Sequence, residues 1–95
     1  MAGMFQKLAI AEMRKACEKS GRPFAVFHQN IMGAGYALTF DRLKDCTDHA
    51  RNYCGMKDTY ARGLYGYSYK TGTLYVFGYD QCPFRFHAFR ISKEA

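Results

Sequence analysis

The feature that most constrains the fold is a change in hydrophobic periodicity around residues 21–23. Residues 3–20 carry apolar side chains at the three- and four-residue spacing of one helix face, whereas residues 24–29 have the composition and two-sided alternation of a strand. The apolar helix stripe comprises Phe5, Leu8, Ala9, Met13, Ala16 and Cys17. Because Gly21 can adopt the left-handed conformation that ends a helix and Pro23 prevents its continuation, the sequence predicts a helix over 3–20 followed directly by a strand over 24–29.

Turn residues divide the rest of the chain into further short elements. Asp41 is a suitable N-cap for a second amphipathic helix that runs to about Cys54, and Gly55 is its stop signal. The Lys70-Thr71-Gly72 segment is a short loop typical of a hairpin. The predicted strands are 36–40, 64–69, 73–79 and 84–91, the last with a bulge near His87-Ala88 that brings its apolar residues to one face.

These elements predict a single α+β domain that spans residues 1–95. A chain of this length has too little interior for two hydrophobic cores. The predicted order is α-β-β-α-β-β-β, with a mostly antiparallel sheet of about five strands. Since each helix has one apolar stripe and a sheet can offer one apolar face, we expect two layers, with both helices packed on the same face of the sheet.

The charge balance favours an acidic partner. Fourteen Lys and Arg residues against eight acids give a net charge of +6, and the excess lies in residues 1–22 and 57–95 rather than in the middle of the chain. No stretch approaches the roughly 20 apolar residues of a membrane span, and the N-terminus lacks the pattern of a secretory signal. We therefore expect a cytoplasmic protein that does not bind membranes.

Candidate catalytic and metal-binding residues are few. Cys17, Cys46, Cys54 and Cys82 include no C-x-x-C pair and are expected to be free thiols, mostly buried as small apolar residues. Cys46 and His49 are three residues apart on one predicted helix, but two ligands do not make a metal site. His28, His49 and His87 are expected at the surface or at sheet edges. The sequence predicts no catalytic residue, metal or cofactor.

The most unusual local feature is the aromatic density of the last third. Tyr65, Tyr67 and Tyr69 share one face of their predicted strand, and Tyr75 and Tyr79 join that face if Leu74 and Val76 point inward. With neighbouring cations, such a face is a platform for stacking bases or for binding a protein. The alternative is that the same rings form the core beneath the helices. The candidate binding residues are Arg14, Lys15, Arg62, Tyr65, Tyr67, Tyr69, Lys70, Tyr75, Tyr79, Arg85, His87 and Arg90.

The predicted function is binding rather than catalysis. We expect a small non-enzymatic protein that docks through a basic, tyrosine-rich surface on a nucleic-acid-handling protein complex, by analogy of size and charge with phage and mobile-element inhibitors of the anti-CRISPR type. Direct RNA or DNA binding and a small cysteine- or metal-dependent enzyme are the alternatives. The chain is expected to be a monomer or a homodimer, because a long edge strand such as 84–91 could pair across a two-fold axis.

Overall fold

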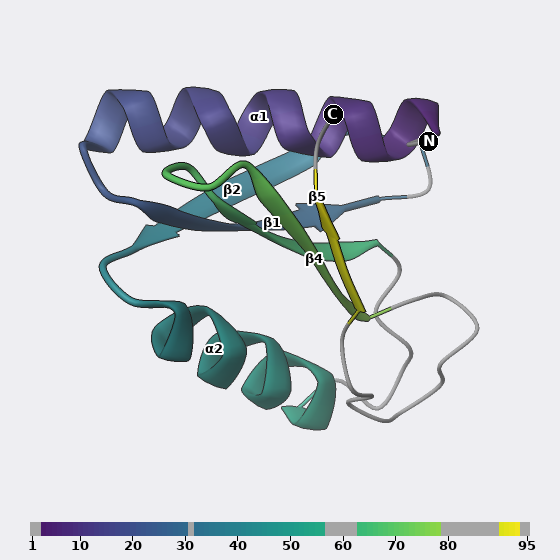
Figure 1. Cartoon of the computed structure of the whole chain (residues 1–95). Coiled ribbons are helices and arrows are strands. Elements are labelled where there is room, and N and C mark those ends of the chain that lie inside the picture. Colours follow the sequence, from purple (N-terminus) through teal and green to yellow (C-terminus); the bar gives the residue numbers. More distant parts are fainter. Residues whose placement is uncertain (1–2, 31, 57–62, 79–89, 94–95) are drawn as a thin grey trace.

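The computed structural model describes residues 3–30, 32–56, 63–78 and 90–93. Within these residues, two helices and five strands follow one another (Figure 1). They are α1 (Met4–Ser20), β1 (Phe24–Gln29), β2 (Gly35–Phe40), α2 (Leu43–Met56), β3 (Leu64–Ser68), β4 (Thr73–Gly78) and β5 (Arg90–Lys93). The general class predicted from the sequence, α+β with two helices and an antiparallel sheet, is confirmed.

The strands form one antiparallel sheet in the order β2-β1-β3-β4-β5. β1 is a central strand because it pairs on one side with β2, its hairpin partner, and on the other with β3. β2 lies at one edge. The predicted strand 84–91 lies largely outside the described residues, which place β5 beside β4 from Arg90 onward.

The two helices cover opposite faces of the sheet, so the prediction of both helices on one face is wrong. Figure 1 shows the sheet between α1 and α2. The helix α1 packs on Ala25 and Phe27, whereas α2 packs on Val26 and Phe24, the alternate residues of the same strand. A central strand that is apolar on both faces needs cover on both sides, and one helix on each face buries both.

The helix α1 ends where the sequence predicts. Gly21 adopts a left-handed conformation with φ of 77°, and its backbone N–H donates to the Cys17 carbonyl at 2.8 Å. The turn directs the chain back beneath α1 as β1. Ala9, Ile10, Met13 and Cys17 are the α1 residues that are buried against the sheet. Neither described helix is long and apolar enough to cross a membrane.

Candidate functional site

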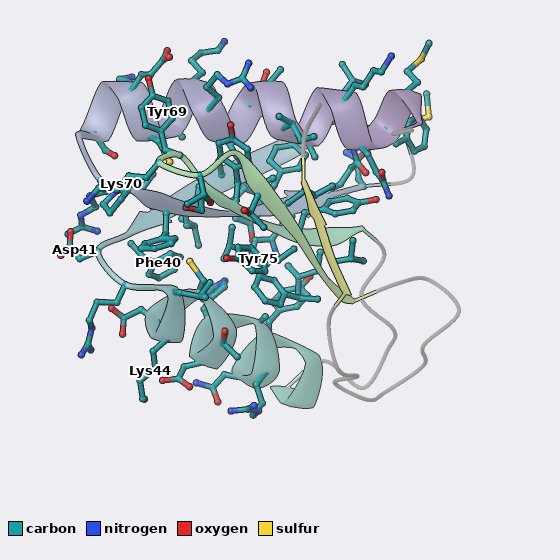
Figure 2. The ribbon with its side chains drawn as sticks, viewed as in Figure 1. Phe40, Asp41, Lys44, Tyr69, Lys70 and Tyr75 are labelled. Atoms are coloured by element: carbon teal, nitrogen blue, oxygen red, sulfur yellow. The ribbon has the colours of Figure 1, made fainter. Side chains whose placement is uncertain are left out.

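The predicted tyrosine face is divided between the two sides of the sheet. Tyr65 is the cross-strand partner of Val76, and Tyr67 that of Leu74, so the two tyrosines share a face with these aliphatic residues under α1. Tyr75 points to the opposite face and packs with Phe77 between the sheet and α2 (Figure 2). The condition under which Tyr75 would join the tyrosine row is therefore not met, because the β3–β4 register pairs Leu74 and Val76 directly with Tyr67 and Tyr65.

Burial also separates these rings from solvent. Tyr65 is 3 % exposed and Tyr67 2 %, and Tyr75 is likewise buried. They are core residues, and they do not form an exposed platform for stacking bases. The interpretation of the rings as core beneath the helices, which the sequence left open, fits these three tyrosines.

Tyr69 differs from the other tyrosines because it lies beyond the end of β3 and is 43 % exposed. Figure 2 shows it beside α1, next to Lys70. Its hydroxyl donates to the Glu18 carboxylate at 2.9 Å, and this hydrogen bond is the main cause of the raised pKa of Tyr69. The structure therefore places the exposed Tyr69 and Lys70 beside the helix that carries Arg14 and Lys15.

Arg14 connects this group to the core. Its guanidinium lies 5.9 Å from the centroid of the Tyr67 ring, and its Nη2 donates to the Tyr67 hydroxyl at 3.3 Å. Lys15 lies exposed on the outer side of α1. Of the other candidates, Arg62, Tyr79, Arg85 and His87 lie outside the described residues, and Arg90 is described only by its backbone position in β5.

An exposed apolar group at the start of α1 was missed from the sequence. Phe5 and Leu8, which were assigned to the buried stripe, are 46 % and 44 % exposed, and Met4 and Met32 are exposed as well. We call these four residues the apolar patch. The buried α1 residues Ala9, Ile10, Met13 and Cys17 already form a complete helix face, so Phe5 and Leu8 fall outside it. The excess width of the apolar stripe was the available signal.

The apolar patch rests on a fixed scaffold. The buried Gln29 side chain donates through Nε2 to the Phe5 carbonyl at 2.7 Å and to the Gly33 carbonyl at 3.0 Å. Gly33 has a φ of 89°, and a Cβ atom there would lie 3.1 Å from the Phe5 ring. Gln29 thus joins the first turn of α1 to the β1–β2 turn, and the two segments present the patch together.

A second group missed from the sequence is a histidine pair between the sheet and α2. Nε2 of His28 and Nε2 of His49 lie 2.8 Å apart, and the His28 ring stacks on Tyr36 and meets Tyr53 edge-on. His28 is buried, so the expectation that it lies at the surface is wrong. Burial, together with the charge of His49, lowers the pKa of His28 to about 4, and burial also lowers that of His49.

Cys17 and Cys46 are buried, as expected. Burial raises the pKa of Cys46 to about 12 and also raises that of Cys17. In the described part of the chain, no three His, Cys, Asp or Glu residues gather closely enough to hold a metal ion. Because both thiols are buried in the core, Cys17 and Cys46 act as small apolar core residues.

Thiol labelling tests this assignment. Because the thiolate is the reactive form, Cys17 and Cys46 are expected to react with iodoacetamide at least about 100-fold more slowly in the folded protein than in urea. Peptide mass spectrometry after timed labelling at neutral pH measures each site separately. Rapid labelling of either thiol under native conditions would contradict its place in the core.

These observations define an α+β protein in which one helix on each side covers an antiparallel sheet, and in which the outer side of α1 combines apolar and basic residues. The chain matches no family model, and no curated protein or solved structure shows significant similarity to it.

Proposed function

We propose that this chain is a small non-enzymatic binding protein that docks through the outer side of α1 on a nucleic-acid-handling protein complex, as inhibitors of the anti-CRISPR type do. The observation that carries the proposal is the pairing of the apolar patch with the basic residues that follow it on the same helix. Large apolar side chains surrounded by cations are typical of the centre of a protein interface rather than of a free surface.

The composition of the α1 surface favours a partner with both apolar and acidic groups. Phe5 and Leu8 offer contact area that becomes buried on binding. Lys7 directly precedes Leu8 of the apolar patch in α1. Lys15 and Lys19 are exposed further along the same helix. The net charge of +6 accelerates the approach to an acidic surface.

The burial of the tyrosines supports a protein partner over direct nucleic-acid binding. Binding of single strands relies on exposed rings on which successive bases stack. Tyr65, Tyr67 and Tyr75 are enclosed by the helices, which leaves Tyr69 as the exposed ring of this group in the described part of the chain. A protein that neutralises an acidic groove needs the cations without the stacking platform.

A binding comparison with two variants tests the proposal. Wild-type protein is expected to bind at least one member of a panel of purified, guide-RNA-loaded CRISPR effector complexes in biolayer interferometry. Combining Leu8→Ser with Lys15→Gln is expected to weaken that binding by at least about tenfold, because it removes one apolar contact and one cation from the interface.

The control is Asn52→Asp, which changes the net charge by the same amount as Lys15→Gln but lies exposed on α2. It is expected to bind as the wild type does. An absence of binding across the panel, combined with a salt-sensitive gel shift of a mixed-sequence oligonucleotide, would replace the proposal with direct nucleic-acid binding. Equal losses of binding in the α1 and α2 variants would show that the net charge, and not the α1 surface, determines the affinity.

A further inference from the structure

The residues of the edge strand β2 itself lack the features that protect sheet edges from pairing. Among the described strands it pairs only with β1, and residues 35–40 contain no charged residue and no proline. Tyr36 and Leu38 are 55 % and 38 % exposed on the face that α2 covers further along the sheet. An uncharged edge with exposed apolar side chains is a template for another strand.

The backbone groups that β2 directs outward follow from its register with β1. The Asn30 N–H donates to the Ala34 carbonyl at 2.7 Å, and bonded pairs recur at every second residue of an antiparallel ladder. This alternation directs the N–H and carbonyl groups of Gly35, Ala37 and Thr39 away from β1. In agreement, the Thr39 carbonyl accepts a hydrogen bond from the exposed Arg22 side chain at 2.9 Å.

We propose that β2 pairs with the β2 strand of a second copy of this chain, antiparallel and centred on Ala37. In this register Tyr36 of each copy lies opposite Leu38 of the other, so that both exposed apolar side chains become covered on the same face. Ala37 lies opposite its own counterpart beneath the helices, where a small side chain fits. Arg22 is displaced from Thr39 at each end, which costs little because Arg22 is an exposed side chain.

The same two-fold axis brings the α1 helices together. Phe5 lies against Gly33, two residues before β2, and Arg22, just past the helix, reaches Thr39 near the end of β2. Between these points, the rises of helix and strand place Ala37 roughly level with Ala16 of α1. Since α1 packs over β2 and β1, and to a lesser extent over β3, two copies joined at β2 bring their α1 helices side by side on the same face of the joined sheet.

The facing sides of the two helices are complementary in charge. Glu12, Ala16 and Lys19 lie on the same side of α1 as Phe5 by their spacing, and that side faces away from Arg14 and its contact with Tyr67. Within the described part of the chain, neither Glu12 nor Lys19 forms an ion pair. Antiparallel helices that cross near Ala16 place Glu12 of each copy beside Lys19 of the other.

Sedimentation measures the dimer directly. Wild-type protein is expected to change from monomer to dimer as its concentration rises from about 1 µM to about 1 mM. Leu38→Lys is expected to stay monomeric over this range, because it places a charge on the pairing edge. The matched control Asn52→Lys adds the same charge to the exposed side of α2 and is expected to dimerise like the wild type. A wild type that stays monomeric, or a Leu38→Lys protein that still dimerises, would overturn the proposal.

A charge exchange tests the orientation of the two copies. Glu12→Lys and Lys19→Glu each place like charges opposite one another twice, and each is expected to weaken its own dimer by roughly tenfold. An equimolar mixture of the two variants restores both opposite-charge pairs, so a heterodimer of nearly wild-type affinity is expected at low salt. Both positions are exposed, and circular dichroism checks that both variants are folded. Failure of the mixture to associate better than either variant alone would overturn the antiparallel arrangement.

Discussion

Replacing Phe77 with alanine is expected to destabilise the protein by about 3–5 kcal/mol. Phe77 is among the largest fully buried side chains, and its ring stacks on Tyr75 with a centroid separation of 6.1 Å in the cluster beneath α2. The cavity left by the ring cannot collapse fully, because rigid strands hold its walls. In a small domain this loss is a large share of the total free energy of unfolding. Urea titration followed by circular dichroism measures it.

Gly66 provides the space that the Phe77 ring occupies, so the effects of substitutions at the two positions on stability are coupled. A Cβ atom at Gly66 would overlap the edge of that ring. Gly66→Ala alone is therefore expected to destabilise the protein by about 1–3 kcal/mol through overpacking. In the double variant the new methyl group enters the space that the ring has left, so the combined loss is expected to fall short of the sum by about 1 kcal/mol or more.

Phe5→Ala is the matched control, because Phe5 is half exposed on α1 and is expected to lose about 1 kcal/mol or less. If Phe77→Ala costs no more than Phe5→Ala, the ring is not a core residue. Strict additivity of Gly66→Ala and Phe77→Ala would show that the two positions do not share one space.

Local signals were sufficient to predict the first helix and the first strand, whereas the second helix begins at Leu43 and continues through the predicted stop signal Gly55 to Met56. The apolar periodicity and the Gly21 stop signal placed the first helix at 3–20, and the structure has it at Met4–Ser20. The first strand, predicted over 24–29, is Phe24–Gln29. These features depend on residues that are neighbours in the chain, and their conformational preferences act over one or two turns of backbone.

The placement of one helix on each face of the sheet also has a signal in the sequence. Residues 24–27 form a continuous apolar run, which is typical of a strand buried on both faces and favours a helix on each side. The β3–β4 register was harder to predict from the sequence. Whether Tyr65 faces the same side as Val76 or as Tyr75 depends on a pairing shift of one residue, and the register from Ser68 back to Tyr65 follows from the turn that joins β3 to β4.

The histidine pair could not be found from spacing. His28 and His49 are 21 positions apart and lie in different elements, and they meet because the helix after β2 returns beneath β1. The apolar patch could not be predicted because its residue types suggest burial. Phe5 and Leu8 have the residue type of a core position, and only the packing of α1 on the sheet shows that the core is complete without them.

The surroundings of His28 Nδ1 indicate which of the two histidines donates the hydrogen bond between them. His28 Nδ1 is buried and has no hydrogen-bond partner among the described residues. A buried N–H without an acceptor is rarer and more costly than an acceptor without a donor. This favours the tautomer in which His28 Nε2 donates to His49 Nε2 and Nδ1 of His28 is unprotonated, an assignment from the network rather than from a visible hydrogen.

Lowering the pH from about 7.5 to about 4 is expected to decrease the free energy of unfolding by roughly 3 kcal/mol through His28. Protonation of the folded state places a charge on the buried His28 ring, and burial together with the charge of His49 lowers the pKa of His28 from 6.5 to about 4. The unfolded chain binds this proton near pH 6.5 and the folded chain only near pH 4. Between these values the unfolded state holds more protons, so the free energy of unfolding decreases as the pH falls.

The measurement is a set of urea titrations between about pH 7.5 and about pH 4.5, compared with those of His28→Phe. The phenyl ring preserves the stacking on Tyr36 and cannot titrate, so the variant is expected to lose most of the pH dependence between pH 6.5 and pH 4.5, and to retain the part due to His49. Since the pKa of Asp48 is lowered below its ordinary value of 3.8, loss of its pairing with Lys44 falls at more acidic pH than this window. Equal slopes in wild type and His28→Phe would mean that His28 is accessible to protons in the folded state, and that α2 does not seal the pair against the sheet.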